Sequence, residues 1–127
     1  MIHLDTNVLI DALTGPRRQA QRLRALIEQG ERTTFATLVL YEWLRGPRSN
    51  EELAAQEALF PRESAVPFGP AEAALAASWY RTIRHPRGRE IDLAIAACAV
   101  TAGATLWTLN REDFQDIPKL TLLDDPA

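Results

Sequence analysis

The chain has 127 residues, of which 46% are hydrophobic, and its formal net charge at pH 7 is −3. This length and composition are typical of one folded domain with a substantial core, and we expect a single domain over residues 1–127. One cysteine and two histidines exclude an intramolecular disulfide, a CxxC redox pair and a zinc site built from cysteine and histidine. The six glycines are too widely spaced for a dinucleotide fingerprint or a phosphate-binding P-loop.

Short apolar segments alternate with segments of helical character along the chain. The first apolar segment ends at Asp5, and residues that start or stop helices separate the segments that follow. We expect strands over 2–4, 33–36, 65–68, 104–109 and 120–123. We expect helices over 6–13, 17–29 and 38–45, from Ser49 to 59, over 70–84, and from Arg89-Glu90 to Gly103.

Capping residues support several of these boundaries. Pro16 favours the start of a helix, and Gly30 is typical of a helix C-terminal cap. Thr37 can cap the helix that follows it, and Ser49 with Glu52 three residues later forms a capping-box pattern. Strands of continuous apolar character separated by helices indicate an α/β fold, a three-layer α/β/α sandwich with a mainly parallel central sheet of about five strands.

Four acids stand out: Asp5, Asp92 and Asp113 come shortly after a strand or at a helix start, and Glu42 lies inside a helical segment that is apolar on nearly every side. Ligands of such folds bind where the strands end, so we expect these carboxylates to converge at one edge of the sheet. Each acid also has a structural interpretation. Asp5 can cap a helix, Glu42 can pair with Arg45, Asp92 suits a helix first turn, and Asp113 can cap a turn. A site with oxygen ligands only selects a hard cation such as Mg²⁺, and Mg²⁺ sites commonly bind substrate phosphates.

Four motifs occur in a fixed order: Leu4-Asp5-Thr6-Asn7, Thr37-x4-Glu42 followed by Leu44 and Gly46, Asp92-x2-Ile95-Ala96-Ala97, and Thr108-x-Asn110-x2-Asp113-Phe114. In order and approximate spacing, they resemble the signature regions of PIN-domain ribonucleases over essentially the whole chain. A short single-domain member of this kind is most similar to the VapC-type toxins of bacterial toxin–antitoxin pairs.

The resemblance implies an endoribonuclease that depends on one or two Mg²⁺ or Mn²⁺ ions and hydrolyses RNA with a metal-activated water. Asp5, Glu42 and Asp92 correspond to the main acidic triad, and Asp113 to a fourth acid at the metal. Thr6, Thr108 and Asn110 match positions that orient ligands, and either Asn110 or Asp113 is the fourth metal-site residue. An ordinary strand-end hydroxyl is the alternative for Thr108.

The resemblance also implies partners. Members of this size act on structured RNA, such as transfer or ribosomal RNA, at a single-stranded loop. They form homodimers and are silenced by a small antitoxin protein. Trp79 and Tyr80 could lie in an interface, although aromatic residues at this spacing are more often core. The single cysteine and the absence of a secretory signal pattern favour a cytoplasmic location without membrane association.

Two segments, 16–24 and 81–89, each carry four arginines and no acid. Such clusters can hold RNA phosphates, whatever the net charge of the chain, or they can be ordinary solvated helix faces. The candidate phosphate-binding residues are Arg17, Arg18, Arg22, Arg84, Arg87 and Arg89, with Arg24 and Arg81 beside them.

Two other functions fit part of the pattern. A phosphohydrolase similar to the haloacid dehalogenases also begins with a strand-end aspartate, but it needs a second acid where Asn7 stands and a lysine that Lys119 is poorly placed to supply. A non-catalytic PIN-like scaffold that binds RNA or protein would not need all four acids. Incubation with RNA and Mg²⁺, with a chelator control, separates the three functions.

Overall fold

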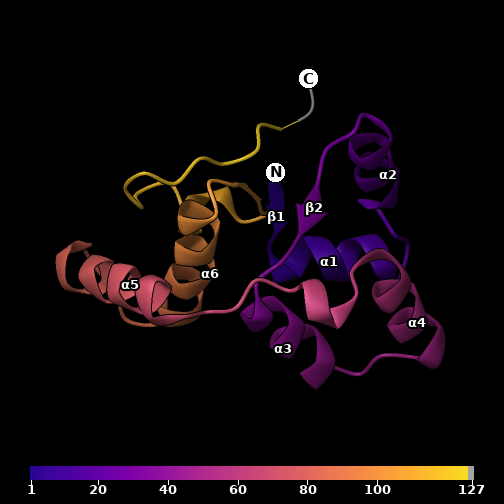
Figure 1. The fold of residues 1–127 in the computed structure, drawn as a ribbon, viewed down its shortest axis with the longest axis horizontal. Helices are drawn as coiled ribbons and strands as arrows, with labels where there is room; N and C mark the ends of the chain where they lie inside the picture. Colours follow the sequence, from indigo (N-terminus) through magenta and orange to yellow (C-terminus); the bar gives the residue numbers. More distant parts are fainter. Residues whose placement is uncertain (126–127) are drawn as a thin grey trace.

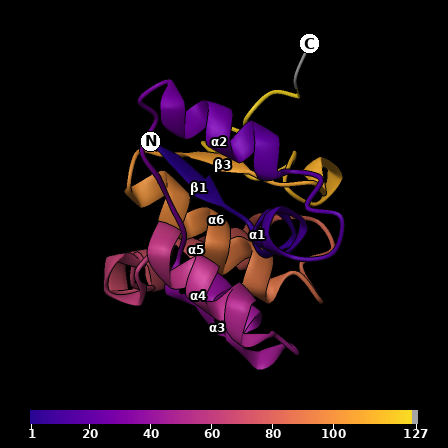
Figure 2. The ribbon, with the colours of Figure 1, turned by 90° about the vertical axis from the view of Figure 1, so that its right-hand side faces the viewer.

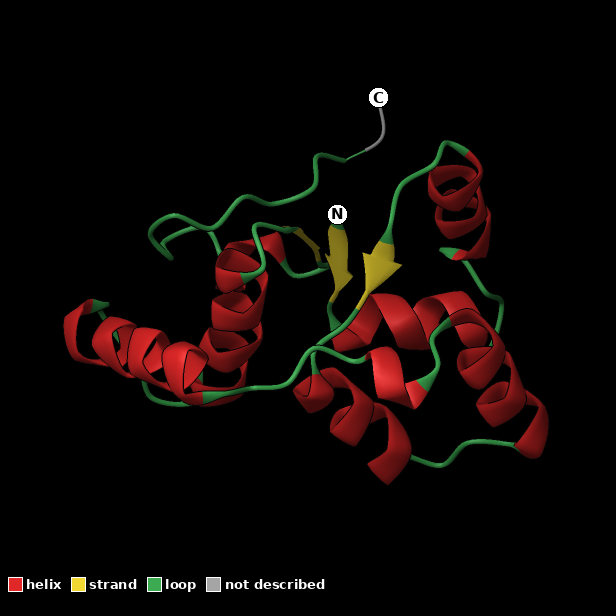
Figure 3. Ribbon diagram, in the orientation of Figure 1, coloured by secondary structure: helices red, strands yellow, loops and turns green. Residues whose placement is uncertain are grey.

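The computed structural model describes residues 1–125 and contains a small parallel sheet (Figures 1 and 3). The central strand β1 (Ile2–Leu4) lies between β2 (Thr33–Thr34) and β3 (Thr105–Trp107), in the order β2-β1-β3. All three strands run in the same direction, with His3 level with Thr34 and Leu106. The three side chains of β1 are buried, as the continuous apolar character predicts for a strand covered on both faces.

The sheet has three strands in the described residues, so the expectation of five strands is wrong, although the α/β class is confirmed. The two remaining segments each make one parallel bridge, Ala36 to Val66 and Leu106 to Leu122. Pro67 follows the first bridge directly, and its missing N–H prevents the ladder from continuing. The second segment pairs with one residue of a strand that is only three residues long.

Six α-helices surround the sheet within residues 1–125: α1 (Thr6–Leu13), α2 (Ala20–Glu28), α3 (Thr37–Arg45), α4 (Asn50–Leu59), α5 (Pro70–Thr82) and α6 (Glu90–Thr101). Figure 2 shows β1 and β3 between α2 on one side and α6 on the other, which is the expected three-layer arrangement. The residues of α6 from Leu93 to Ala99 are all buried. Four of these seven are alanines, whose small side chains let α5 and the sheet approach α6 closely.

Helix boundaries agree with the capping residues in some places and differ in others. Ser49 and Glu52 form the expected capping box, in which the two backbone N–H groups donate at 2.8 and 3.1 Å. Helix α2 begins at Ala20 and not at residue 17, because Arg17 has a φ of 54°, a left-handed conformation that no helix residue adopts. Thr37 is the first residue of α3 and not its cap, and its hydroxyl accepts from the Phe68 N–H at 3.4 Å.

Trp79 is buried against the core, whereas the neighbouring Tyr80 is 38% exposed. The aromatic pair is therefore divided between core and surface. None of the helices in residues 1–125 has the length and apolar character needed to cross a membrane.

Candidate active site

Asp5 stands at the centre of the site, at the end of β1. Its backbone places it as the N-cap of α1, and its Oδ1 accepts from the Thr6 N–H at 2.8 Å. Its Oδ2 accepts from the Thr108 hydroxyl at 2.7 Å. The residue is only 5% exposed, and this burial raises the pKa of the Asp5 carboxyl above its ordinary value. Asp5 is thus a helix cap and also a buried carboxylate with a second partner from a distant strand.

Thr108 follows β3 directly and fixes the second oxygen of Asp5. Its hydroxyl accepts from the Asn110 N–H at 3.1 Å and from the Asn7 side-chain amide at 3.5 Å. Because both acceptor positions of this hydroxyl are filled, its one hydrogen is directed to the Asp5 carboxylate. The buried hydroxyl is therefore more than an ordinary strand-end group, and Asn110 contributes through its backbone.

Asn7 is a residue that the sequence did not single out for a role at the site. Besides the contact with Thr108, its side-chain carbonyl accepts from the Leu109 N–H at 3.2 Å. Asn7 thereby ties the start of α1 to the loop after β3. The signal available in the sequence is an amide two residues after a strand-end acid, since such a side chain lies one half-turn along the helix that the acid caps.

Glu42 reaches the site from the middle of α3. Its Oε1 accepts from the Thr6 hydroxyl at 2.5 Å, and its Oε2 lies 3.4 Å from Arg45 one turn along the helix. The expected ion pair with Arg45 is present, and the same carboxylate also contacts the segment that carries Asp5. The side chain is 20% exposed, so it remains partly accessible to solvent.

Asp92 lies in the first turn of α6, as the sequence predicts. The structure records no hydrogen bond or ion pair for its carboxylate within residues 1–125. Its pKa is raised to about 6, first by burial and then by the negative charges of Asp5, Asp113 and Glu42, while Arg89 acts in the opposite direction. This carboxyl therefore experiences the field of all three other candidate acids.

Asp113 comes from the 3₁₀ helix η2 (Arg111–Asp113), which follows β3. Its own side chain is exposed, but its charge contributes to the raised pKa values of both Asp5 and Asp92. Phe114, directly after it, is buried and anchors the segment to the core. The charges of Glu42 and Asp113 thus both act on Asp5 and Asp92.

The arrangement fits a hydrated divalent cation. Within residues 1–125, no three histidine, cysteine, aspartate or glutamate side chains are close enough to ligate one ion together. Mg²⁺ does not require such a cluster, because one or two carboxylates normally hold it, with water and substrate phosphate oxygens completing its shell. Asp5 and Asp92 are partly desolvated carboxylates whose charges a cation would compensate. The donors present are all oxygens, as a hard cation prefers.

The candidate arginines have different surroundings. The guanidinium of Arg22 lies 5.1 Å from the centre of the Trp107 ring and donates to the Asp124 carbonyl. Arg89 forms an ion pair with Asp116, at 2.6 Å. The structure records no ion pair for Arg17, Arg18, Arg24, Arg81, Arg84 or Arg87 within residues 1–125.

Comparisons with protein families, with known sequences and with solved structures find similar proteins that agree with one another. The family model described as PIN domain matches residues 2–120. The chain is 35% identical over 122 residues to Ribonuclease VapC19 of Mycobacterium tuberculosis, covering 92% of this chain and 94% of that protein. The fold is similar to that of VapBC2 from Rickettsia felis bound to a promoter DNA fragment, with a TM-score of 0.78, 24% identity, and coverage of 97% and 98% of the two chains. A toxin–antitoxin complex from Klebsiella pneumoniae is also similar, with a TM-score of 0.71, 22% identity, and coverage of 95% and 96%.

Proposed function

This chain belongs to the PIN domain family, and we propose that it is an endoribonuclease dependent on Mg²⁺ or Mn²⁺, the toxin of a toxin–antitoxin pair. The observation that carries the proposal is that Asp92 is partly buried in the field of Asp5, Asp113 and Glu42; burial first, and then these negative charges, raise the pKa of Asp92 to about 6. Such a concentration of negative charge is unfavourable in the isolated protein and becomes favourable when a cation is bound. The relative with the highest identity given above is named a ribonuclease.

Asp5 and Asp92 are the residues that we propose as holding one or two divalent ions, with Glu42 and Asp113 at their periphery. When bound, the cation supplies Lewis-acid stabilisation of the phosphate that is attacked and neutralises the pocket so that an anion can enter. Either Asn110 or Asp113 would supply the fourth position; within residues 1–125 the backbone N–H and carbonyl of Asn110 have partners and its side chain has none.

The chain's own residues orient these carboxylates. Thr108 holds one oxygen of Asp5, and the start of α1 holds the other, so that the carboxylate plane is fixed before any ligand arrives. Thr6 does the same for Glu42 through its hydroxyl. A fixed carboxylate loses little entropy when it binds a cation, and this preorganisation strengthens the site.

For the RNA itself, we propose that phosphates flanking the cleaved bond contact the arginines of the two basic segments. Arg84 and Arg87, in the loop between α5 and α6, lead directly into the helix that carries Asp92. Phosphate contacts give affinity without base recognition, which suits a substrate bound by its shape. A structured RNA such as transfer or ribosomal RNA, cut at a single-stranded loop, can expose its backbone to such a site.

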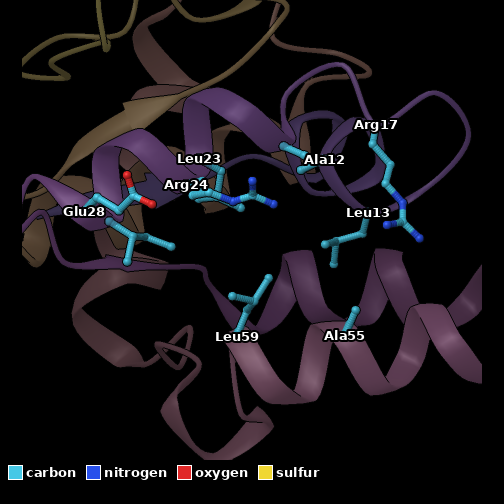
Figure 4. Close-up of a pocket in the computed structure, with 10 residues that line it drawn as sticks. Ala12, Leu13, Arg17, Leu23, Arg24, Glu28, Ala55 and Leu59 are labelled. Carbon is cyan, nitrogen blue, oxygen red and sulfur yellow. The ribbon is translucent and has the colours of Figure 1, made fainter.

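We propose that the antitoxin binds in an apolar groove between α1, α2 and α4. The groove has a volume of about 510 Å³, and Figure 4 shows Leu13 and Leu23 facing Ala55 and Leu59 of α4. Arg17 and Arg24 also line it, which favours a partner segment with apolar and acidic side chains. The similar Klebsiella structure is described as a toxin–antitoxin complex, which supports an antitoxin partner.

We also propose a homodimer. Phe68 and Tyr80 are exposed aromatic residues that line a shallow apolar hollow of about 350 Å³ with residues of α5 and α6. Burial of such a surface against a second copy would remove apolar area from water.

Incubation of the purified chain with total RNA tests the proposed function. We expect cleavage in Mg²⁺ or Mn²⁺, no cleavage in EDTA, and recovery when the ion is restored. Asp5→Asn and Asp92→Asn, which keep the side-chain shape and remove the charge, should lose cleavage by at least about a hundredfold. Glu31→Gln, at an exposed acid whose ion-pair partner is the N-terminal amine and not a residue of the site, is the matched control. If folded wild type cleaves no RNA with either ion, the proposed ribonuclease function is wrong.

A further inference from the structure

The guanidinium of Arg89 donates three hydrogen bonds near the acids. Its Nη1 donates to Asp116 Oδ2 at 2.9 Å, and its Nη2 donates to Asp116 Oδ1 at 2.6 Å, which is a bidentate pair. Nη2 also donates to the backbone carbonyl of Asp113 at 2.8 Å. A guanidinium that forms two parallel bonds to one carboxylate and a third to a carbonyl is held in one orientation.

The backbone of Arg89 is fixed as well. Arg89 is the N-cap of α6, and its carbonyl accepts from the Leu93 N–H at 2.9 Å. Asp92 lies three residues further along the same helix. The contact therefore joins the helix start that carries Asp92 to the segment that carries Asp113.

On the other side of this contact, residues 111–117 are held in two ways. Phe114 and Ile117 are buried in the core. The backbone hydrogen bonds of the segment are local, with Asp113 N–H donating to Asn110 and Phe114 N–H donating to Arg111, each at 3.0 Å, and the Arg111 side chain also donates to the Leu123 carbonyl. Since Asp113 itself is exposed, its position depends on the buried neighbours and on the bond from Arg89 to its carbonyl.

We propose that Arg89 and Asp116 form a clamp that positions Asp113 relative to Asp92, and that Arg89 is a positioning residue for the acid site. This inference rests on the proposed metal-dependent function. It gives Arg89 a different role from that of the neighbouring arginines, because the donors that would meet an RNA phosphate are already bound within the chain. Asp116, which has no role in the sequence-based interpretation, becomes part of the support of the site.

The charge of the clamp is also suited to this place. The Asp116 carboxylate compensates the positive charge of the Arg89 guanidinium, so the guanidinium pairs with a group outside the acid site. Without Asp116, the guanidinium would be free to turn toward Asp113 and Asp92 and to compete with a divalent ion. The side chain of Arg89 is 19% exposed and that of Asp116 is 48% exposed, so the pair is partly screened and its effect should be local.

Hydrogen exchange and Mn²⁺ binding of the full chain test the clamp, with Asp116→Asn and Arg89→Lys as the two variants. Asp116→Asn removes the charge and keeps the shape, whereas Arg89→Lys keeps the charge and removes the paired donors. In the absence of metal, we expect the amides of Asp113, Phe114 and Ile117 to exchange about fivefold faster in both variants. By calorimetry, we expect the affinity for Mn²⁺ to fall about tenfold.

Glu112→Gln is the matched control, because it makes the same charge change in the same segment and Glu112 has no ion pair within residues 1–125. Its exchange and its Mn²⁺ affinity should equal those of wild type. Unchanged exchange over 111–117 in Asp116→Asn and Arg89→Lys would overturn the clamp. Faster exchange with unchanged Mn²⁺ affinity would overturn its positioning role. If wild type binds no Mn²⁺ while exchange becomes faster in the variants, the proposed metal site is wrong and the clamp itself stands.

Discussion

Asp92→Asn should stabilise the metal-free protein. The ionised carboxylate of Asp92 lies in the field of three other acids, and the structure records no partner for it within residues 1–125. Its pKa in the folded protein is about 6, against an ordinary value of 3.8. At pH 7 the ionised Asp92 carboxylate therefore destabilises the folded state. The asparagine amide removes this charge and keeps the shape of the side chain.

The size of the effect follows from the pKa. The difference of about two units between the folded and the ordinary pKa of Asp92 corresponds to a destabilisation of at most about 3 kcal/mol, at 1.36 kcal/mol per pKa unit. Asp92 is partly exposed, so solvent screening reduces this figure, and the loss of a first-turn acid costs roughly 0.3–1 kcal/mol of favourable interaction with the helix dipole. We expect a net gain of about 1 kcal/mol, or roughly 3–5 °C in Tm for a domain of this size.

Thermal melts in EDTA at pH 7 measure this gain, and Mg²⁺ provides the complementary test. Mg²⁺ at about 100 times its Kd adds about 2.7 kcal/mol to wild type by mass action, and it should add less to the variant. A variant that melts below wild type in EDTA and responds equally to Mg²⁺ would refute the shared pocket.

The pH dependence gives the sign of the effect. The raised pKa of Asp92 means that ionised Asp92 destabilises the fold above pH 6, and that this cost disappears as the pH falls from about 6 toward 4. His3 acts in the opposite direction, because burial lowers its pKa from 6.5 to about 4 and the unfolded chain takes up the proton first. The two effects oppose each other in wild type. The difference in Tm between the variant and wild type isolates Asp92, and it should shrink on acidification. A difference that is constant from pH 7 to pH 4.5 would contradict the account.

Three further predictions concern the groups around the acids. Thr108→Val should lower the free energy of unfolding at pH 7 by about 1–2 kcal/mol in urea titrations, because buried Asp5 loses a charged hydrogen bond, whereas Thr108→Ser should match wild type; equal midpoints for Val and wild type would contradict this. Arg87→Gln should reduce the slope of log K against log salt for RNA binding by roughly 0.7–0.9, and an unchanged slope would make Arg87 an ordinary solvated side chain. Leu59→Asp should weaken binding of the cognate antitoxin by at least about tenfold, with exposed Tyr41→Asp as the control, and equal affinities would exclude the groove.

The sequence predicted the parts of the fold that depend on local pattern. The apolar run before Asp5, the capping box at Ser49 and the buried alanine-rich helix after Asp92 all occur as expected. The start of α2 could not be predicted in this way, because Arg17 adopts a left-handed turn that non-glycine residues rarely show. The strand expected at 65–68 has the right composition, but Pro67 limits it to one bridge.

For the site, the strand-end rule was enough to find acids that influence one another, because it depends only on which residues follow strands or begin helices. It could not identify Asn7, whose role depends on a contact with a loop 101 residues away in sequence. It could not identify the pair of Arg89 and Asp116 either, since 27 residues separate them and no helical or strand spacing relates them. Charge clustering alone placed Arg89 with the phosphate-binding candidates, and only side-chain geometry distinguishes it from Arg87.

Calorimetric titration of Mn²⁺ into wild type and the variants Asp5→Asn, Glu42→Gln, Asp92→Asn and Asp113→Asn tests the central claim, that Asp5 and Asp92 hold a divalent cation with Glu42 and Asp113 at its periphery. We expect saturable binding to wild type and an affinity at least about tenfold lower for Asp5→Asn and Asp92→Asn, with smaller losses for the two peripheral acids. Binding of equal affinity in all five proteins, or no binding to folded wild type, would contradict the claim.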